Sequence, residues 1–240
     1  MTTPRIYLPP ELCVGETLEI TAENYHYLAR VLRVRVGETV EVLDGVGTRY
    51  RGKVEKLGRD SLRLSLMERE TVDIELPRFH LFQALPQGRK IEEVIHRTVE
   101  LGVHSLHPFS SSRSAPAGDK GRLGRWERIC MEASRTAGRA YLPQMRPVIA
   151  WEEMLREISM LGTVLVADER GGAKVGNALA GKESLDVGLV IGPEGGFSDM
   201  EKAEIISAGA IPVTLGRHVL RTESAGAVLL TLARHHYGFI

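Results

Sequence analysis

Residues 187–233 read VGLVIGPEGGFSDMEKAEIISAGAIPVTLGRHVLRTESAGAVLLTLA and contain one arrangement of elements twice. The apolar run Val187–Ile191 predicts a buried strand of a parallel sheet, and a glycine-rich loop follows it. Ser198 and Glu201 have the spacing of a capping box, which predicts a helix that begins at Asp199 and carries its two isoleucines inward. The first half of this stretch should therefore form a strand, a loop and a helix in succession.

The second arrangement begins where the first helix ends. Ile211–Thr214 predicts a second strand, Leu215–Arg221 a second loop, and Thr222 has the residue type that caps a second helix. Consecutive strand-loop-helix units place their loops at the carboxyl ends of neighbouring strands, where open α/β sheets bind ligands. We therefore expect one ligand site between the two loops.

The segments IGPEGGFS at 191–198 and LGRHVLRTESA at 215–225 resemble the two signature loops of the SPOUT methyltransferases, and within them those of the RsmE family. The resemblance extends over the whole chain. It implies an α/β fold in which residues 1–70 form a PUA-like small β-barrel that binds RNA. Residues 74–240 would form the SPOUT methyltransferase domain, with a deep trefoil knot that brings the two loops together around one ligand.

The resemblance also implies an activity. RsmE enzymes methylate N3 of a uridine in small-subunit (16S) ribosomal RNA and take the methyl group from S-adenosylmethionine. A GPEGG segment alone would predict no more than a tight turn, so the assignment depends on its pairing with the second loop. The expected cofactor-binding residues are Ala167, Ile191, Gly192, Pro193, Glu194, Gly195, Gly196, Leu215, Gly216, Val219, Leu220 and Ala225.

Methylation at N3 sets a requirement for the site. Uracil N3 is an imide nitrogen whose lone pair becomes a nucleophile only when its proton leaves, so a base is needed, or a cation that stabilises the resulting anion. We expect Arg221 to stabilise that anion and Glu223 to assist proton removal or to hold Arg221 in place. The two could also form a structural ion pair at the start of the last helix. Glu194 is a further polar candidate.

The composition limits the class of protein. A chain of 240 residues with 43% hydrophobic residues can bury one sizeable core or two smaller ones. No apolar run reaches the roughly 18 residues of a membrane span, so we expect a cytoplasmic protein without a membrane partner. Cys13 and Cys130 fit no metal or redox spacing, and His104 and His107 should point in different directions on a strand. We therefore expect no metal.

The first 70 residues show short alternating patterns typical of a small β-barrel. Between the first two expected strands, residues 25–32 predict a brief helix, and a strand after it would place Arg33 and Arg35 on one face. The charged segment Glu68–Pro77, which ends in proline, is expected to be the linker. The expected strands are Thr17–Ile20, Thr39–Leu43, Tyr50–Glu55 and Leu62–Leu66.

The formal net charge is zero, but the charges are unevenly distributed. Residues 78–146 contain twelve Lys and Arg against six Asp and Glu, whereas residues 147–240 contain eight against twelve. A basic middle region is typical of a protein that holds RNA on one face, although a solvated surface would give the same count. A long polar loop at residues 110–126 belongs to this region, and such length indicates function or disorder.

Arginines are the main candidates for RNA contact, because guanidinium groups bind phosphate oxygens bidentately. Those near the first helix could equally be solvated side chains on a half-exposed sheet. Gln87, Thr136 and His218 depart from the RsmE pattern, so no role at these positions is carried over. The candidate RNA-binding residues are Arg30, Arg33, Arg35, Arg89, Lys90, Arg97, Arg113, Arg125 and Arg139.

The apolar positions of the last helix indicate a homodimer, and in RsmE proteins the partner subunit completes each site. The expected RNA partner is small-subunit ribosomal RNA, either free or in the assembled subunit. Two other functions stay open. One is a SPOUT enzyme with another target, such as a ribose 2′-hydroxyl of transfer RNA. The other is a non-catalytic ribosome-assembly factor that binds RNA without turning over the cofactor.

Overall fold

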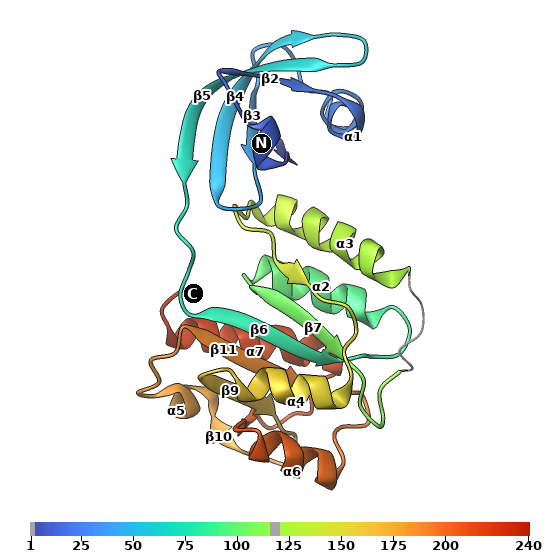
Figure 1. The fold of residues 1–240 in the computed structure, drawn as a ribbon, viewed down its shortest axis with the longest axis vertical. Helices are drawn as coiled ribbons and strands as arrows, with labels where there is room; N and C mark the ends of the chain where they lie inside the picture. Colours follow the sequence, from blue (N-terminus) through green and yellow to red (C-terminus); the bar gives the residue numbers. More distant parts are fainter. Residues whose placement is uncertain (1–2, 116–120) are drawn as a thin grey trace. The chain divides into compact units, whose positions relative to one another are not determined.

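The computed structural model describes residues 3–115 and 121–240 of the chain (Figure 1). The chain divides into two compact units. Unit 1 consists of Met1–Ile74 with Ser134–Leu142, and unit 2 consists of Glu75–Ala133 with Pro143–Ile240. Residues 116–120, which belong to the long polar loop expected from the sequence, lie outside the described residues.

Unit 1 is built on a five-stranded sheet with the order β1-β3-β4-β5-β2. The β1–β3 pair is parallel and the other pairs are antiparallel. Because β1 and β2 stay at the edges, the sheet forms an open half-barrel. The strands are β1 (Arg5–Tyr7), β2 (Thr17–Ile20), β3 (Thr39–Leu43), β4 (Thr48–Leu57) and β5 (Leu62–Thr71). The expected β-rich unit is confirmed in this open form.

The segment between β2 and β3 differs from the prediction. It is split into α1 (Ala22–His26) and a π-helix, η2 (Tyr27–Val31), and a short 3-10 turn, η1 (Pro10–Leu12), precedes β2. The prediction of a strand with Arg33 and Arg35 on one face is wrong. Arg33 has φ 57°, in the left-handed region, and this conformation interrupts an extended chain.

The segment predicted to be the linker begins later than the sequence indicates. Strand β5 continues to its last residue at position 71 because its charged end pairs with β4. Arg51 Nη1 lies 2.9 Å from Glu68 Oε2, and Arg49 Nη1 lies 3.3 Å from Glu70 Oε2. The alternating charges near position 70 therefore belong to a strand, and only residues 72–77 connect it to the next element.

Unit 2 contains a seven-stranded sheet with the order β10-β12-β9-β11-β6-β7-β8, and its strand pairs are parallel. The two strands of the repeated arrangement, β11 and β12, flank β9, which confirms the predicted α/β architecture. The strands are β6 (Arg78–Ala84), β7 (Ser105–Phe109), β8 (Gln144–Met145), β9 (Thr163–Ala167), β10 (Ala173–Lys174), β11 (Asp186–Ile191) and β12 (Ile211–Thr214).

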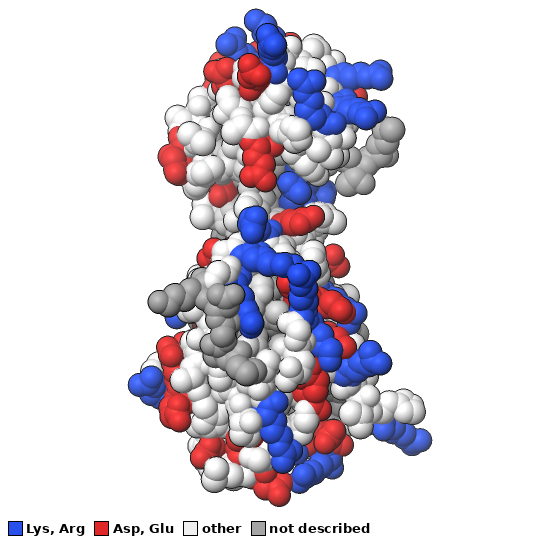
Figure 2. All heavy atoms as spheres, turned by 90° about the vertical axis from the view of Figure 1, so that its right-hand side faces the viewer, with Lys and Arg blue, Asp and Glu red and all other residues white. Residues whose placement is uncertain are grey.

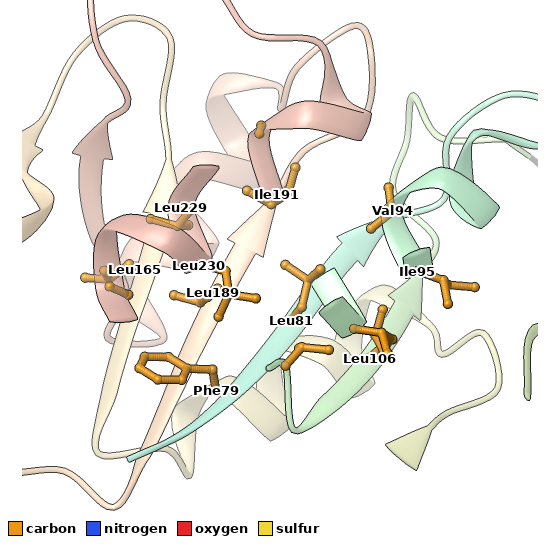
Figure 3. Close-up of a cluster of buried hydrophobic side chains, with 14 of the residues drawn as sticks. Phe79, Leu81, Val94, Ile95, Leu106, Leu165, Leu189, Ile191, Leu229 and Leu230 are labelled. Carbon is orange, nitrogen blue, oxygen red and sulfur yellow. The ribbon is translucent and has the colours of Figure 1, made fainter. Parts of the chain in front are cut away.

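Helices cover both faces of this sheet, as buried parallel strands require. They are α2 (Lys90–Glu100), α3 (Arg122–Ala137), α4 (Trp151–Ser159), α5 (Val175–Leu179), α6 (Asp199–Ser207) and α7 (Thr222–His236). Along β6, Phe79 and Leu81 join the core packed by α2 and α7 (Figure 3), whereas Phe82 and Ala84 join the core packed by α4 and α6. A hydrophobic core therefore lies on each face.

The start of α6 is the capping box that the sequence predicts. Ser198 Oγ accepts a hydrogen bond from the Glu201 N–H at 3.2 Å, and Glu201 Oε2 accepts one from the Ser198 N–H at 2.8 Å. Glu201 Oε1 accepts from the Ser112 N–H at 2.8 Å. Burial would raise the pKa of Glu201, but these hydrogen bonds outweigh it and lower the pKa. Of the two isoleucines expected inside, Ile205 is buried and Ile206 is 49% exposed.

The start of α7 departs from the prediction. The residue before the first helical turn is Arg221 and not Thr222, and no side chain caps the helix there. Thr222 is already helical, and its hydroxyl donates a hydrogen bond to the Gly192 carbonyl at 2.7 Å. Threonine is common as a helix cap, which is why the sequence predicts this role for Thr222. In the structure its hydroxyl instead joins α7 to the loop after β11.

A chain of polar side chains lies at the amino ends of β6, β7 and β11. We call its members, Asp186, His80, Ser105, His107 and Glu157, the histidine network. His80 Nε2 lies 2.7 Å from Asp186 Oδ1, and His80 Nδ1 lies 2.7 Å from Ser105 Oγ. Ser105 Oγ lies 2.7 Å from His107 Nε2, and His107 Nδ1 lies 2.7 Å from Glu157 Oε2. The network therefore links three strands to α4.

Arginines stand at both ends of the histidine network. Arg78 binds Asp186 through Nε at 2.8 Å and Nη2 at 2.7 Å, and Arg146 Nη2 lies 3.9 Å from Glu157 Oε1. Burial, helped by the neighbouring cationic and histidine side chains, lowers the pKa of His107 to about 3. Burial also raises the pKa of Glu157. Both shifts favour the uncharged forms of His107 and Glu157.

Candidate functional site

A cavity of about 360 Å³ opens at the carboxyl ends of β9, β11 and β12. This volume lies within the usual range of small-molecule sites. We call residues 192–198 the first loop and residues 215–221 the second loop. The structure brings all but one of the predicted cofactor-binding residues to the wall of this cavity, namely Ala167, Ile191, Gly192, Pro193, Glu194, Gly196, Leu215, Gly216, Val219, Leu220 and Ala225.

Glycines allow the loops to take this shape. Gly196 has φ 65° and Gly216 has φ 122°, conformations that residues with a side chain rarely adopt. A Cβ atom at Gly192 would lie 3.1 Å from an aromatic ring of the first loop, closer than ordinary packing allows. Gly195 does not line the cavity, and its carbonyl accepts a hydrogen bond from Arg113 Nη1 at 2.9 Å.

The wall also includes residues outside the set of predicted cofactor-binding residues. Asp168 and Lys202 form an ion pair at 2.7 Å, with both side chains largely buried. Burial would raise the pKa of Asp168, but hydrogen bonds from Lys202 and from the Arg170 N–H outweigh it and lower the pKa. Asp168 directly follows β9, and the carboxyl end of a parallel strand is where such a sheet binds ligands. The other such residues are Lys90, Glu169, Phe197, Arg217, His218, Arg221, Thr222 and Glu223.

The cavity combines apolar and ionised groups. Ile191, Leu215 and Leu220 provide apolar side chains of the kind that enclose a purine ring, with main-chain polar groups beside them. The carboxylates of Glu169 and Glu223 line the same wall and suit a ligand with positively charged centres. These features fit S-adenosylmethionine, which joins a purine nucleoside to a cationic sulfonium and an amino-acid group.

Glu223 is a buried acidic residue of the cavity wall with an unpaired oxygen. The residue is 7% exposed, and its Oε2 atom has no hydrogen-bond partner among the described residues. Arg221 Nη1 lies 3.9 Å from Oε1, but the Arg221 side chain is 87% exposed. Exposed ion pairs contribute about 0–1 kcal/mol, so this pair does not account for the burial of Glu223. A buried carboxylate with a free oxygen can accept a proton or a hydrogen bond from a ligand.

Glu194 differs from Glu223 because its carboxylate is occupied. Lys90 Nζ donates to Glu194 Oε1 at 2.9 Å, and the Gln87 N–H donates to the same oxygen at 3.0 Å. Burial would raise the pKa of Glu194, but these bonds outweigh it and lower the pKa, while the pKa of Lys90 is raised by the same contact. Glu194 is therefore held ionised as part of the cavity wall.

Arg97, a predicted RNA-binding residue, reaches the first turn of α7. Its Nη1 atom donates to the Glu223 carbonyl at 3.3 Å and to Ser224 Oγ at 3.1 Å. Lys90 and Arg113, predicted for the same role, bind the first loop as described above. These three cations therefore support the segments that border the cavity.

The other predicted RNA-binding cations of unit 2 do not line the cavity. Arg125 Nη2 lies 2.8 Å from Glu92 Oε2 on α2, and Arg89 is exposed in the turn before that helix. Figure 2 shows Lys and Arg side chains interspersed with Asp and Glu over the face that it presents. Basic groups on this face therefore lie among acidic ones.

Unit 1 contains the remaining predicted RNA-binding residues. Arg30 lies in η2, and Arg33 and Arg35 follow it; all three are exposed. Arg139 is partly buried, and its carbonyl accepts a hydrogen bond from the Tyr7 hydroxyl. The first three therefore present their guanidinium groups to solvent within one short segment.

Residues 3–115 and 121–240 contain no group of three or more His, Cys, Asp or Glu side chains that could hold a metal ion. Across the same ranges, no helix has the length and apolar character needed to cross a membrane. Cys13 and Cys130 are both buried.

Comparison with known families gives two matches. Residues 74–234 match the family described as RNA methyltransferase domain, and residues 20–67 match the one described as RNA methyltransferase PUA domain. The first match alone covers more than half of the chain.

Individual proteins are similar over nearly the whole chain. Ribosomal RNA small subunit methyltransferase E of Mycobacterium tuberculosis is 33% identical over 224 residues, which cover 90% of this chain and 85% of that protein. The protein of the same name from Synechocystis sp. is 31% identical over 229 residues, covering 94% and 75%. The crystal structure of a ribosomal RNA small subunit methyltransferase E from Neisseria gonorrhoeae bound to S-adenosyl methionine has a TM-score of 0.88 and 30% identity, and covers 98% of each chain.

Proposed function

Because this chain belongs to the ribosomal RNA small subunit methyltransferase E family, we propose that it transfers a methyl group from S-adenosylmethionine to N3 of a uridine in small-subunit ribosomal RNA. The observation that carries the proposal is the buried carboxylate of Glu223. Glu223 lines a cavity walled by both loops, and its buried Oε2 atom has no partner among the described residues. Such a group suits a reaction in which the acceptor must lose a proton.

S-adenosylmethionine, when bound, supplies a methyl group on a positively charged sulfur. The chain holds the donor through main-chain groups of the two loops, and Ile191, Leu215 and Leu220 enclose the purine. Positioning of donor and acceptor contributes most of the acceleration, because the reaction needs little covalent help from the protein.

The residues at the start of α7 prepare the acceptor. The Glu223 carboxylate accepts the proton from uracil N3, and Arg221 stabilises the negative charge that develops on the ring. The Arg221 side chain is 87% exposed, so it is free to turn toward an incoming base. Glu194 is less suited to act as the base, since Lys90 and Gln87 already occupy its carboxylate.

RNA contact by exposed cations of each unit is part of the proposal. In unit 1, a π-helix and the left-handed conformation of Arg33 place arginines at three positions of one short segment. Such irregular or strained backbone persists mainly where function requires it. Arg30, Arg33 and Arg35 are therefore assigned to phosphate contacts, and in unit 2 the exposed Arg89 has the same assignment.

Further expectations belong to the same proposal. Residues 1–70 act as the RNA-binding module and residues 74–240 as the methyltransferase domain, in which the chain forms a trefoil knot. Leu232 on α7 is 38% exposed, which supports a homodimer through this helix. Light scattering coupled to size-exclusion chromatography tests the dimer. Ribosomal RNA as substrate implies a cytoplasmic setting.

Mass spectrometry of nucleosides tests the reaction. Purified protein is incubated with S-adenosylmethionine that carries a heavy methyl group, together with small-subunit ribosomal RNA either free or in assembled subunits. The nucleosides are then separated and identified. Labelled 3-methyluridine is the expected product, because it reports the donor, the RNA and the position on the base together.

Other products would redirect the assignment. A labelled ribose 2′-O-methyl group in transfer RNA, offered in parallel, would identify a different target for the same cavity. Absence of label in every RNA, while calorimetry shows that both the cofactor and ribosomal RNA bind, would indicate an assembly factor that does not catalyse transfer. Either result contradicts the uridine proposal.

A further inference from the structure

A buried hydrogen-bonded chain joins the first loop to the start of α7. Gln83 on β6 is 1% exposed, and Thr222 on α7 is 5% exposed. Gln83 Nε2 donates to Thr222 Oγ1 at 2.9 Å, and Thr222 Oγ1 donates to the Gly192 carbonyl at 2.7 Å. Gly192 follows β11, the strand that pairs with β6. Three segments that are distant in sequence therefore meet at one hydroxyl.

The direction of each bond follows from the hydrogens available. A threonine hydroxyl has one hydrogen, and the Gly192 carbonyl is an acceptor only, so that hydrogen goes to Gly192. Thr222 Oγ1 must then accept from Gln83, which places the amide nitrogen toward it. The same nitrogen also donates to the Ala84 carbonyl at 3.1 Å. Both amide hydrogens are used, so the hydroxyl of Thr222 is held from two sides.

The hydrogen-bonded chain through Thr222 lies beside the residues proposed to carry out the reaction. Thr222 stands between Arg221 and Glu223, and Gly192 borders the cavity. We propose that Gln83 and Thr222 are positioning residues that set the separation between the first loop, which holds the methyl donor, and the Glu223 carboxylate. This inference rests on the proposed function of Glu223. Displacement by about 1 Å can lower the rate of an oriented reaction by on the order of 10²-fold.

Four variants separate positioning from mere stabilisation. Thr222→Val keeps the branched shape and removes the hydroxyl, whereas Thr222→Ser keeps the hydroxyl. Gln83→Met removes the amide hydrogens at the other end of the chain. Thr231→Val is the matched control, because the Thr231 hydroxyl donates within α7 to the Ala227 carbonyl at 2.8 Å.

Three quantities are measured for each variant: the single-turnover rate of methyl transfer to small-subunit RNA at saturating S-adenosylmethionine, the Kd for that cofactor, and the folded fraction. Thr222→Val should lower the rate per folded molecule on the order of 10- to 100-fold, and by more than it weakens cofactor binding. Thr222→Ser should recover most of the rate, and Thr231→Val should leave it unchanged.

Two results would overturn the proposal: a Thr222→Val rate per folded molecule equal to that of wild type, or a Thr222→Ser rate as low as that of Thr222→Val. If Thr222→Val does not fold, Gln83→Met carries the same prediction, and an unchanged rate in that variant is equally decisive. Wild-type protein, assayed alongside the variants, separates a failure of the proposed function from a failure of the positioning role. Inactive wild type contradicts the proposed function, whereas active wild type with equally active variants contradicts only the positioning role.

Discussion

The two ends of the unit 2 sheet both gather buried polar side chains, but they satisfy them differently. At the amino ends, both ring nitrogens of His80 and of His107 have a partner at 2.7 Å. At the carboxyl ends, Glu223 Oε2 and Gln83 Oε1 are buried without a partner among the described residues. Unpaired buried groups lower stability, so a fold keeps them where a function needs them. The contrast separates a polar cluster whose ring nitrogens are all paired from one in which the proposed base keeps an unpaired oxygen.

The largest expected effect is that of Glu223→Gln on catalysis. The amide keeps the shape of the side chain but cannot accept a proton, so the methyl-transfer rate should fall about 10²- to 10⁴-fold. The free energy of unfolding of the Glu223→Gln protein should not fall, because the substitution removes an unpaired buried charge. Single-turnover kinetics and urea unfolding measure the two quantities.

Glu100→Gln, an exposed change of the same kind on α2, is the control and should alter neither quantity. A Glu223→Gln enzyme with the wild-type rate would show that another group takes the proton, and the contrast between the two ends of the sheet would lose its functional meaning.

Ser105→Ala should have the opposite profile. The change leaves His80 Nδ1 and His107 Nε2 without the hydroxyl that they share, which should lower the free energy of unfolding by about 1–3 kcal/mol. The methyl-transfer rate per folded molecule should stay the same, since the histidine network lies at the other end of the strands. Ser207→Ala, at an exposed position of α6, is the matched control. Reduced activity without reduced stability would assign the network a part in the reaction.

The pH dependence of stability should report on His107. Its pKa is about 3 in the fold and has the ordinary histidine value of 6.5 in the unfolded chain, so unfolding binds a proton between these limits. The contribution of His107 to the free energy of unfolding is fully present above pH 6.5. It is lost as the pH falls toward 3, by at most about 1.4 kcal/mol per pH unit. The raised pKa of Glu157 acts in the opposite sense and reduces the slope.

His107→Gln should therefore flatten the rise of unfolding free energy with pH between 4 and 6.5, measured by urea unfolding in a series of buffers. His96→Gln, an exposed change on α2, should keep the wild-type slope. Equal slopes in wild type and His107→Gln would mean that His107 titrates as it does in the unfolded chain.

Lys90→Met should have the smallest effect. The pair between Lys90 and Glu194 is partly exposed and therefore weak, so the Kd for S-adenosylmethionine should rise by less than about fivefold. High salt should shrink the difference, because exposed charges are screened. Isothermal titration calorimetry at two ionic strengths measures it, with Lys182→Met as an exposed control. A loss of tenfold or more would place Lys90 in direct contact with the ligand.

Much of the unit 2 fold could be predicted because its signals are local. Strand β12 occupies the predicted residues, and α6 begins at the predicted capping box. The cavity followed from the same pattern, although the two strands are not neighbours as expected. Strand β9 lies between β11 and β12, and because the three strands are parallel, both loops still open at one edge of the sheet. Predicted residues of both loops therefore line one wall, with Gly195 as the exception.

Several features that local patterns do not reveal depend on partners distant in sequence. The charged end of β5 is a strand only because β4 supplies opposite charges across from it. Ser134–Leu142 belongs to unit 1, where the Arg135 guanidinium lies 3.9 Å from the centre of the Tyr27 ring. Gln83 was visible as a polar residue in an apolar strand, but its partner, Thr222, lies 139 positions away. No local pattern identifies such pairs.

The histidine network has a consequence for the charge of the molecule. Its four contacts of 2.7 Å need four hydrogens if all are hydrogen bonds, but two neutral imidazoles and one hydroxyl supply only three. With neutral imidazoles, three of the four contacts can therefore be hydrogen bonds at one time. The network has a place for one further hydrogen, so the uptake of a single proton completes its hydrogen bonds and raises the net charge of the molecule by one, with every partner already in position.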